Sequence, residues 1–213
     1  MGFSSDYVTA RHRFREAAER LGWMCHAYST GTAGLHGEDL TIDVATSLPT
    51  QTDRALVISS GLHGVEGHFG SAIQEELLER WKRDSGVPRA VRCVLVHALN
   101  PYGFAWSRRF DDDNIDLNRN ILTEAMPYTG STDDYRRFNR LLNPRHAPSG
   151  WDFFCARALW AMVIHGTPAL KQALATGQYD FPKGLFFGGR GPSRTRKLLQ
   201  QHMKSWIGNP PRQ

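Results

Sequence analysis

Residues 59–70 read Ser-Ser-Gly-Leu-His-Gly-Val-Glu-Gly-His-Phe-Gly and join two apolar segments of different periodicity. The segment before them, residues 55–58, is continuously apolar, which is typical of a strand buried on both faces of a parallel sheet. After them, an apolar residue recurs at every fourth position from Phe69 to Trp81, which predicts an apolar stripe on a helix. The glycine-rich stretch is therefore predicted to form a strand-to-helix turn at the carboxyl edge of an α/β sheet, where ligands bind.

Within this turn, His63 and Glu66 lie three positions apart. An imidazole nitrogen and a carboxylate oxygen are zinc ligands in proteins, so the pair is a candidate part of a metal site. A structural alternative stays open, in which the histidine is no ligand and Glu66 stabilises the amino end of the following helix. His68 is a competing candidate ligand, but its place at the start of the helix predicts a side chain that faces solvent.

The composition of the whole chain indicates a globular protein with one domain. The 213 residues are 40% hydrophobic and 22% charged, and no apolar run is long enough to cross a bilayer. The amino-terminal residues lack the pattern of a secretory signal, so a cytoplasmic location is expected. Cys93 and Cys155 lie in apolar patterns and are predicted to be buried free thiols.

Positive charge concentrates at the carboxyl end of the chain. After Asp180 the sequence has seven lysines and arginines and no acidic residue. Such a segment binds nucleic acid or an acidic partner in some proteins and is a solvated helix face in others. No nucleic-acid-binding motif accompanies it, so a nucleic-acid partner is not expected. The loop over residues 188–193 lacks the phosphate-binding glycine pattern and is predicted to be a structural turn.

The remaining elements follow from apolar periodicity and from turn residues. A helix is predicted over residues 6–21, a hairpin of strands over 24–29 and 40–45, and an interior strand over 91–96. Further helices are predicted over residues 133–142, 151–163, 167–177 and 193–207, and the second of these has one apolar side. The order of strands and helices predicts an α/β fold.

A second polar stretch follows the interior strand. Residues 100–103, Asn-Pro-Tyr-Gly, are predicted to form a turn, and residues 104–120 place arginines, amides and acids at the same carboxyl edge of the sheet. Arg109 and Arg119 are candidates to bind a carboxylate, because a guanidinium presents paired donors that match it. The alternative is that both arginines only neutralise the neighbouring acids.

Taken together, these motifs resemble the zinc carboxypeptidase superfamily. The resemblance rests on His63-x-x-Glu66, a strand, Asn100-Pro101-x-Gly103, an arginine and residues 116–120, Asp-Leu-Asn-Arg-Asn, in that order. The superfamily includes the carboxypeptidase A-like peptidases and the succinylglutamate desuccinylase/aspartoacylase deacylases. Among its branches, the chain most resembles a bacterial one known only as a domain of unknown function.

The resemblance implies a fold and a division of the chain. The fold is a mostly parallel sheet with flanking helices, of the phosphorylase/hydrolase-like kind. Residues 1–120 are expected to form the sheet core of a single domain, and residues 121–208 a mainly helical insertion.

The resemblance also implies roles for individual residues. His63 and Glu66 are similar to zinc ligands of the family, and Arg109 to the arginine that polarises the scissile carbonyl. Asn118 and Arg119 look like the pair that binds the carboxylate of the substrate. The activity implied is zinc-dependent hydrolysis of a peptide or N-acyl amide next to a carboxylate, with small peptides or N-acyl amino acids as substrates. The alternative function is that of a non-catalytic module that binds an anion or nucleic acid through the basic carboxyl-terminal segment.

Two features of the family pattern are missing from this sequence. No histidine on a later strand supplies the third zinc ligand, and no glutamate general base follows. The chain is therefore expected to be truncated, with its third ligand beyond Gln213, and to bind zinc weakly with little activity. The absent strands would leave a sheet edge exposed, so self-association through that edge is expected. No membrane partner is expected.

Overall fold

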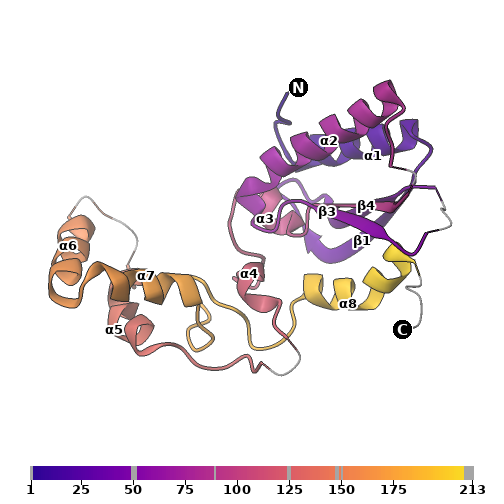
Figure 1. Ribbon diagram of the computed structural model, residues 1–213. Coiled ribbons are helices and arrows are strands. Elements are labelled where there is room, and N and C mark those ends of the chain that lie inside the picture. The colour runs from indigo at the N-terminus through magenta and orange to yellow at the C-terminus, as the bar shows by residue number, and fades with distance from the viewer. Residues whose placement is uncertain are drawn as a thin grey trace. The chain divides into compact units, whose positions relative to one another are not determined.

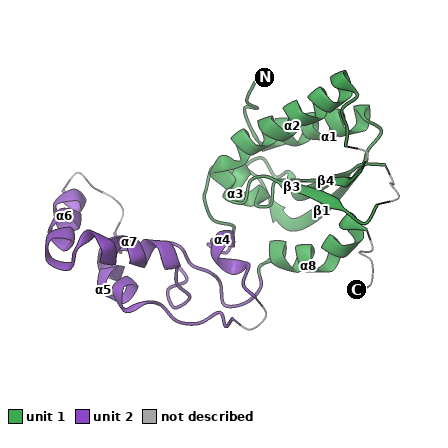
Figure 2. Ribbon diagram, in the orientation of Figure 1, with its two compact units in different colours: residues 1–112, 193–213 green, residues 113–192 purple. Residues whose placement is uncertain are grey.

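The computed structural model describes residues 2–48, 52–88, 90–123, 126–146, 149 and 151–208. The chain forms two compact units (Figure 2). The first unit comprises residues 1–112 and 193–213, and the second unit comprises residues 113–192. The last helix thus belongs to the unit that contains the sheet.

The first unit is built on a four-stranded sheet with the order β1-β2-β4-β3. Its strands are β1 (Met24–Ala33), β2 (Asp39–Thr46), β3 (Ala55–Ser59) and β4 (Arg92–His97). The predicted hairpin is confirmed, since β1 pairs with β2 in antiparallel orientation. Among the described residues the prediction of a mostly parallel sheet is wrong, because β2 and β4 are also antiparallel and only β3 and β4 are parallel. A parallel pair needs a crossover connection, and here only β3 and β4 are joined by one, through a helix.

Helices cover both faces of this sheet. They are α1 (Tyr7–Arg20), the 3-10 turn η1 (Gly64–Glu66), α2 (Gly67–Asp84), α3 (Pro101–Ala105) and α8 (Arg194–Ile207). Figure 1 shows α1 and α2 side by side on one face, with α8 on the other. None of the helices in the described part of the chain is long and apolar enough to cross a membrane.

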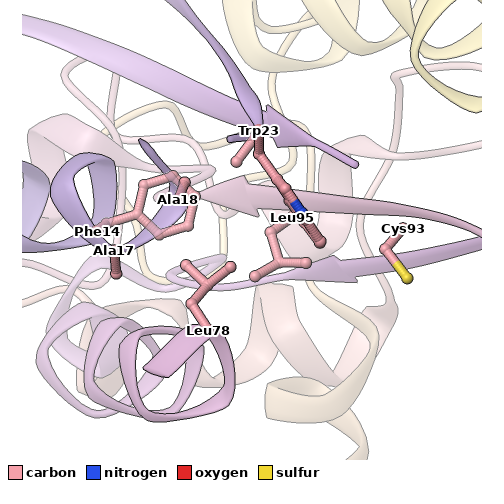
Figure 3. Close-up of a cluster of buried hydrophobic side chains, with 8 residues drawn as sticks. Phe14, Ala17, Ala18, Trp23, Leu78, Cys93 and Leu95 are labelled. Atoms are coloured by element: carbon pink, nitrogen blue, oxygen red, sulfur yellow. The ribbon is translucent and has the colours of Figure 1, made fainter. Parts of the chain in front are cut away.

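Strand β4 is the interior strand that its sequence predicts. Cys93 and Leu95 point to the face of α1 and α2, where they join a buried cluster with Phe14 and Leu78 (Figure 3). The alternate residues Val94 and Val96 pack on the other face, in the cluster that contains Trp206 and the inward residues of α8. Because successive side chains of a strand point to opposite faces, β4 contributes to both halves of the core.

The strand predicted over residues 55–58 is confirmed as β3, parallel to β4, but its predicted burial on both faces is wrong. The apolar stripe predicted for α2 is not the buried face of that helix. In the part of the chain that the structure describes, β3 has a neighbour on one side only, and its Leu56 and Val57 are exposed. On α2, Phe69 is exposed, whereas the polar Gln74 is buried. The Gln74 amide nitrogen donates to two strand carbonyls and its oxygen accepts from a serine hydroxyl, and these bonds allow the polar face to turn inward.

The Asn-Pro-Tyr-Gly stretch begins a helix and is not a free-standing turn. The Asn100 side chain accepts a hydrogen bond from the Gly103 amide at 2.8 Å, and Pro101 occupies the first helical position. Asparagine at the cap and proline at the first position are both common at helix starts. The same residue types favour turns, which explains the error.

The second unit is helical. It contains α4 (Leu117–Asn120), α5 (Asp133–Leu142), α6 (Phe154–His165) and α7 (Thr167–Thr176), and its small core is formed by Tyr135, Phe138, Leu141, Ala161 and Ala173. Of the two thiols predicted to be buried, Cys93 is buried and Cys155, on α6, is exposed. The apolar side predicted for this helix is also exposed at Phe154 and Leu159.

Candidate metal centre

The two predicted ligands His63 and Glu66 face one another. His63 is in an extended conformation just before η1, and Glu66 ends that turn. Their side chains meet with His63 Nδ1 and Glu66 Oε1 3.0 Å apart. The histidine is largely buried, whereas the side chain of Glu66 is 60% exposed. Of the two candidate metal ligands, His63 is thus enclosed by the protein and Glu66 is accessible to solvent.

Glycines bring this bend against α3. A Cβ atom on Gly64 would lie 1.9 Å from the carbonyl carbon of Gly103, so only glycine permits the contact. The approach aligns two main-chain hydrogen bonds: the Val65 amide donates to the Arg108 carbonyl, and the Gly64 amide donates to the Arg109 carbonyl. The first motif and the candidate catalytic arginine therefore belong to one continuous piece of structure.

Arg109 is further fixed by the cap of α3. Its carbonyl accepts a hydrogen bond from the Asn100 side-chain amide at 3.2 Å, and its side chain is half-buried. Asn100 thus has two roles, since it caps α3 with its oxygen and holds the main chain of Arg109 with its nitrogen. Only the first role is local in sequence.

The other histidines near this region have structural contacts. His97 is fully buried, its Nε2 lies 2.9 Å from the Ser71 hydroxyl, and its ring stacks on Phe14. Burial lowers the pKa of His97 to about 3, with help from the positive charges of Arg11 and Arg15.

His68 does not face solvent as predicted. It is half-buried, its Nδ1 lies 3.0 Å from the Ser4 carbonyl oxygen, and its ring packs edge-on against Phe104.

The pair of donors fits a zinc ion in part. Two ligands about 2.0–2.2 Å from a tetrahedral zinc stand roughly 3.4 Å apart, and the observed separation is only a few tenths of an ångström shorter. Among the residues that the structure describes, no group of three or more histidines, cysteines and acids converges on one point. The described chain therefore offers two protein ligands, His63 and Glu66.

Asn118 and Arg119 lie in the second unit, on α4. Asp116 caps this helix by accepting from the Asn118 amide, and the Asn118 side chain is exposed. The stem of Arg119 lies against Gly177, where a Cβ atom would come within 2.7 Å of it. Within the described residues, Nε of Arg119 is buried and has no hydrogen-bond partner. Nη1 of the same guanidinium donates to the Asn118 carbonyl at 3.1 Å, so among the described residues only the buried Nε lacks an acceptor, and an anion that reached Nε would complete the hydrogen bonding of the group.

Sequence reasoning missed the residues that shape the surroundings of Arg119. Gly177 makes room for its stem, and the Tyr179 hydroxyl donates to its carbonyl at 2.8 Å. Burial raises the pKa of Tyr179, although the positive charge of Arg119 opposes that rise. Both residues lie about sixty positions from Arg119 in the sequence, so no local pattern could identify them.

The basic carboxyl-terminal segment is not a uniformly solvated face. Arg196 is buried, and Arg194 forms an ion pair with Asp112. In the loop over residues 188–193, the carbonyls of Gly188 and Gly191 accept from the Asn120 side chain. These contacts favour structural roles over binding of nucleic acid or phosphate.

A comparison with models of protein families gave a match over almost the whole chain. The family described as "Protein of unknown function (DUF2817)" matches residues 3–210. The chain belongs to this family. The predicted branch, one known only as a domain of unknown function, is therefore confirmed. A comparison with curated proteins gave no match.

Several solved structures are similar to this DUF2817 chain. A protein from Shewanella frigidimarina assigned as a succinylglutamate desuccinylase/aspartoacylase is 18% identical, with a TM-score of 0.45 over 86% of this chain and 44% of its own. Bovine thrombin-activatable fibrinolysis inhibitor is 13% identical, with a TM-score of 0.41 over 58% of this chain and 44% of its own. A protein from Shewanella baltica assigned as a metallopeptidase is 20% identical, with a TM-score of 0.39 over 73% and 50%.

This chain covers half or less of the length of each of these three proteins. All three TM-scores are below 0.5, so these similarities do not identify an activity.

Proposed function

We propose that this chain carries the first part of a zinc hydrolase site, which cleaves a peptide or N-acyl amide bond next to a carboxylate. The observation that carries the proposal is the 3.0 Å approach of His63 Nδ1 to Glu66 Oε1, on a bend hydrogen-bonded to the main chain of Arg108 and Arg109. The nitrogen and oxygen donors are those that zinc takes in hydrolases. When bound, zinc lowers the pKa of a water ligand and polarises a carbonyl.

The unequal exposure of the two ligands suits such a site. His63 is held in the bend with its Nδ1 facing the Glu66 carboxylate. A metal ion would take the place of the proton shared between them, with the deprotonated nitrogen and the carboxylate oxygen as its ligands. Glu66 is open to solvent, so a substrate can reach the same place without rearrangement of the fold. Both groups bind metal only in their deprotonated forms, and zinc binding should therefore weaken as the solution is acidified.

Arginine and amide side chains would bind the rest of the substrate. Arg109 would stabilise the negative charge that develops on the scissile carbonyl oxygen. Asn118 and Arg119 would hold the substrate carboxylate, and the unsatisfied Nε of Arg119 in the described structure supports this role. A fixed carboxylate orients the adjacent amide for attack.

A complete site needs more than the described residues supply. Catalytic zinc has three protein ligands and a water in most enzymes, and His63 and Glu66 are two. We infer that the third ligand and the general base lie outside the described residues. With two ligands, the chain should bind zinc weakly and hydrolyse its substrates slowly.

A competition titration of zinc against a chromophoric chelator tests the metal site. We expect measurable binding by the wild type and a loss of about tenfold or more for His63→Ala and Glu66→Gln, because loss of a ligand costs at least as much affinity as loss of a residue that only orients a ligand. His36→Ala is the matched control, since His36 is exposed in the turn between β1 and β2. Equal zinc affinity in the wild type and His63→Ala would refute the site.

A further inference from the structure

Helix α6 of the second unit exposes its large apolar side chains, which is the opposite of an ordinary surface helix. It packs on the core of its unit through the small residues Ala158 and Ala161. Its large apolar residues point outward, with Trp160 66% exposed and Val163 76% exposed. A surface helix normally buries its large apolar side chains and exposes its polar ones.

The outer face of α6 has almost no charge. Arg157 is the only acidic or basic residue of the helix apart from His165, and it lies near Asp152, with 3.4 Å between the charged groups. A helix that is apolar on all sides is normally covered on all sides. At 12 residues, α6 is too short to span a bilayer. It also lacks the lysine- and arginine-rich face of helices that lie on membrane surfaces.

The exposed apolar area is that of a protein interface. Three aromatic residues, Trp151, Phe153 and Trp160, expose roughly 400 Å² if a whole side chain is about 200 Å². Leu159, Val163 and Ile164 add about 200 Å². The total of roughly 600 Å² is at the upper end of the roughly 300–600 Å² of the largest patch on a typical monomer. It is about three quarters of the roughly 800 Å² that each partner buries in a standard interface.

The spacing of the outward residues is self-complementary. Phe153, Ala156, Trp160 and Val163 follow the three-four-three spacing of a seam between two packed helices. If two copies of α6 lie antiparallel about a two-fold axis at position 158, Trp160 of one copy meets Ala156 of the other. Phe153 then meets Val163. A large residue is opposite a smaller one at every level, as close packing requires.

We propose that α6 is the dimerisation helix of this protein and pairs antiparallel with α6 of a second copy. The contact is isologous, so the same surface serves both chains and the assembly closes at two. Tryptophan at the centre of such a surface is the residue type most often responsible for binding energy. Self-association through this helix is distinct from association through the exposed edge of β3.

Sedimentation of the full chain over a concentration series, from about 1 to about 100 μM, tests the proposal. The wild type should change from monomer to dimer within this range. Trp160→Glu should raise the dissociation constant about a hundredfold or more, because it buries a charge at the centre of the seam. Leu35→Glu is the matched control, since Leu35 is an exposed leucine in the turn between β1 and β2. It should leave the dissociation constant unchanged.

A second variant separates a specific helix pair from general stickiness. Ala156→Trp adds apolar surface but fills the space that Trp160 of the partner needs, so it should weaken the dimer at least tenfold. A stronger association of Ala156→Trp, or a dimer that survives Trp160→Glu, would overturn the proposal. A wild type that stays monomeric and instead floats with phosphatidylcholine–phosphatidylserine vesicles would also overturn it, in favour of a membrane surface.

Discussion

Strand β4 and helix α6 are both apolar segments, and each contains one arginine and one histidine. All of β4 beyond its first residue is buried, whereas α6 buries only Ala161 fully. The strand has β2 and β3 at its sides and helices on both faces. The helix has α5 and α7 on one side of it. The apolar content of a segment therefore indicates that its side chains favour burial. Within the described fold, the neighbouring strands and helices decide whether those side chains are in fact buried.

The largest expected difference between the two segments is in stability. Leu95→Ala in β4 should lower the free energy of unfolding by about 2–5 kcal/mol, because it leaves a cavity in the buried cluster. Leu159→Ala in α6 removes an exposed side chain and should change it by only about 0.5 kcal/mol or less. Urea unfolding, followed by circular dichroism at low protein concentration, measures both. Equal losses would show that α6 is covered within the monomer.

Next in size is the expected change of the unfolding free energy with acid, which comes from His97 of β4. The pKa of His97 is lowered to about 3 in the folded chain. As the pH falls, His97 is therefore protonated in the unfolded chain at a higher pH than in the folded chain, and this favours unfolding. This contribution to stability is complete above about pH 6.5 and is lost progressively as the pH falls from there toward 3. The double variant Ser71→Ala/His97→Phe should flatten the curve of stability against pH over that range. Leu159→Ala in α6 should leave the shape of that curve unchanged, and a reversed result would place the acid sensitivity outside β4.

A smaller difference is expected between two glycines, one from each unit. Gly64→Ala should cost about 1–3 kcal/mol of unfolding free energy, since its Cβ atom would overlap the main chain of Gly103. It should also weaken zinc binding, because the clash moves the bend that carries His63. At Gly191, by contrast, a Cβ atom would meet nothing within 4 Å, so Gly191→Ala is a matched control with little expected effect. Thermal unfolding and zinc titration of both variants check this, and identical behaviour would argue against a tightly packed bend.

The parts of the fold that sequence predicted are those set by local patterns. The hairpin, the interior strand and helix α8 follow from alternation, helical spacing and turn residues. The contact between His63 and Glu66 was also predictable, because a separation of three residues within a glycine bend brings their side chains together. The family was predictable from the order of several short motifs, each weak alone.

The errors arose where burial depends on distant partners. The exposure of β3 follows from its position at the edge of the sheet, which its apolar sequence does not encode. The inward turn of Gln74 depends on hydrogen bonds to strands on both sides of it in sequence. The environment of Arg119 is supplied by Gly177 and Tyr179, which no pattern near Arg119 indicates.

The most direct test of the proposed function is whether zinc binds at His63 and Glu66 together. Side-chain nitrogen resonances of the histidines, recorded by NMR during a zinc titration of the full chain, distinguish His63 from the other imidazoles. We predict that Nδ1 of His63 shifts on addition of zinc, and that the shift is lost in Glu66→Gln while the fold is retained. A zinc-dependent shift confined to other histidines, or a His63 shift that is unaffected by Glu66→Gln, would contradict the shared site.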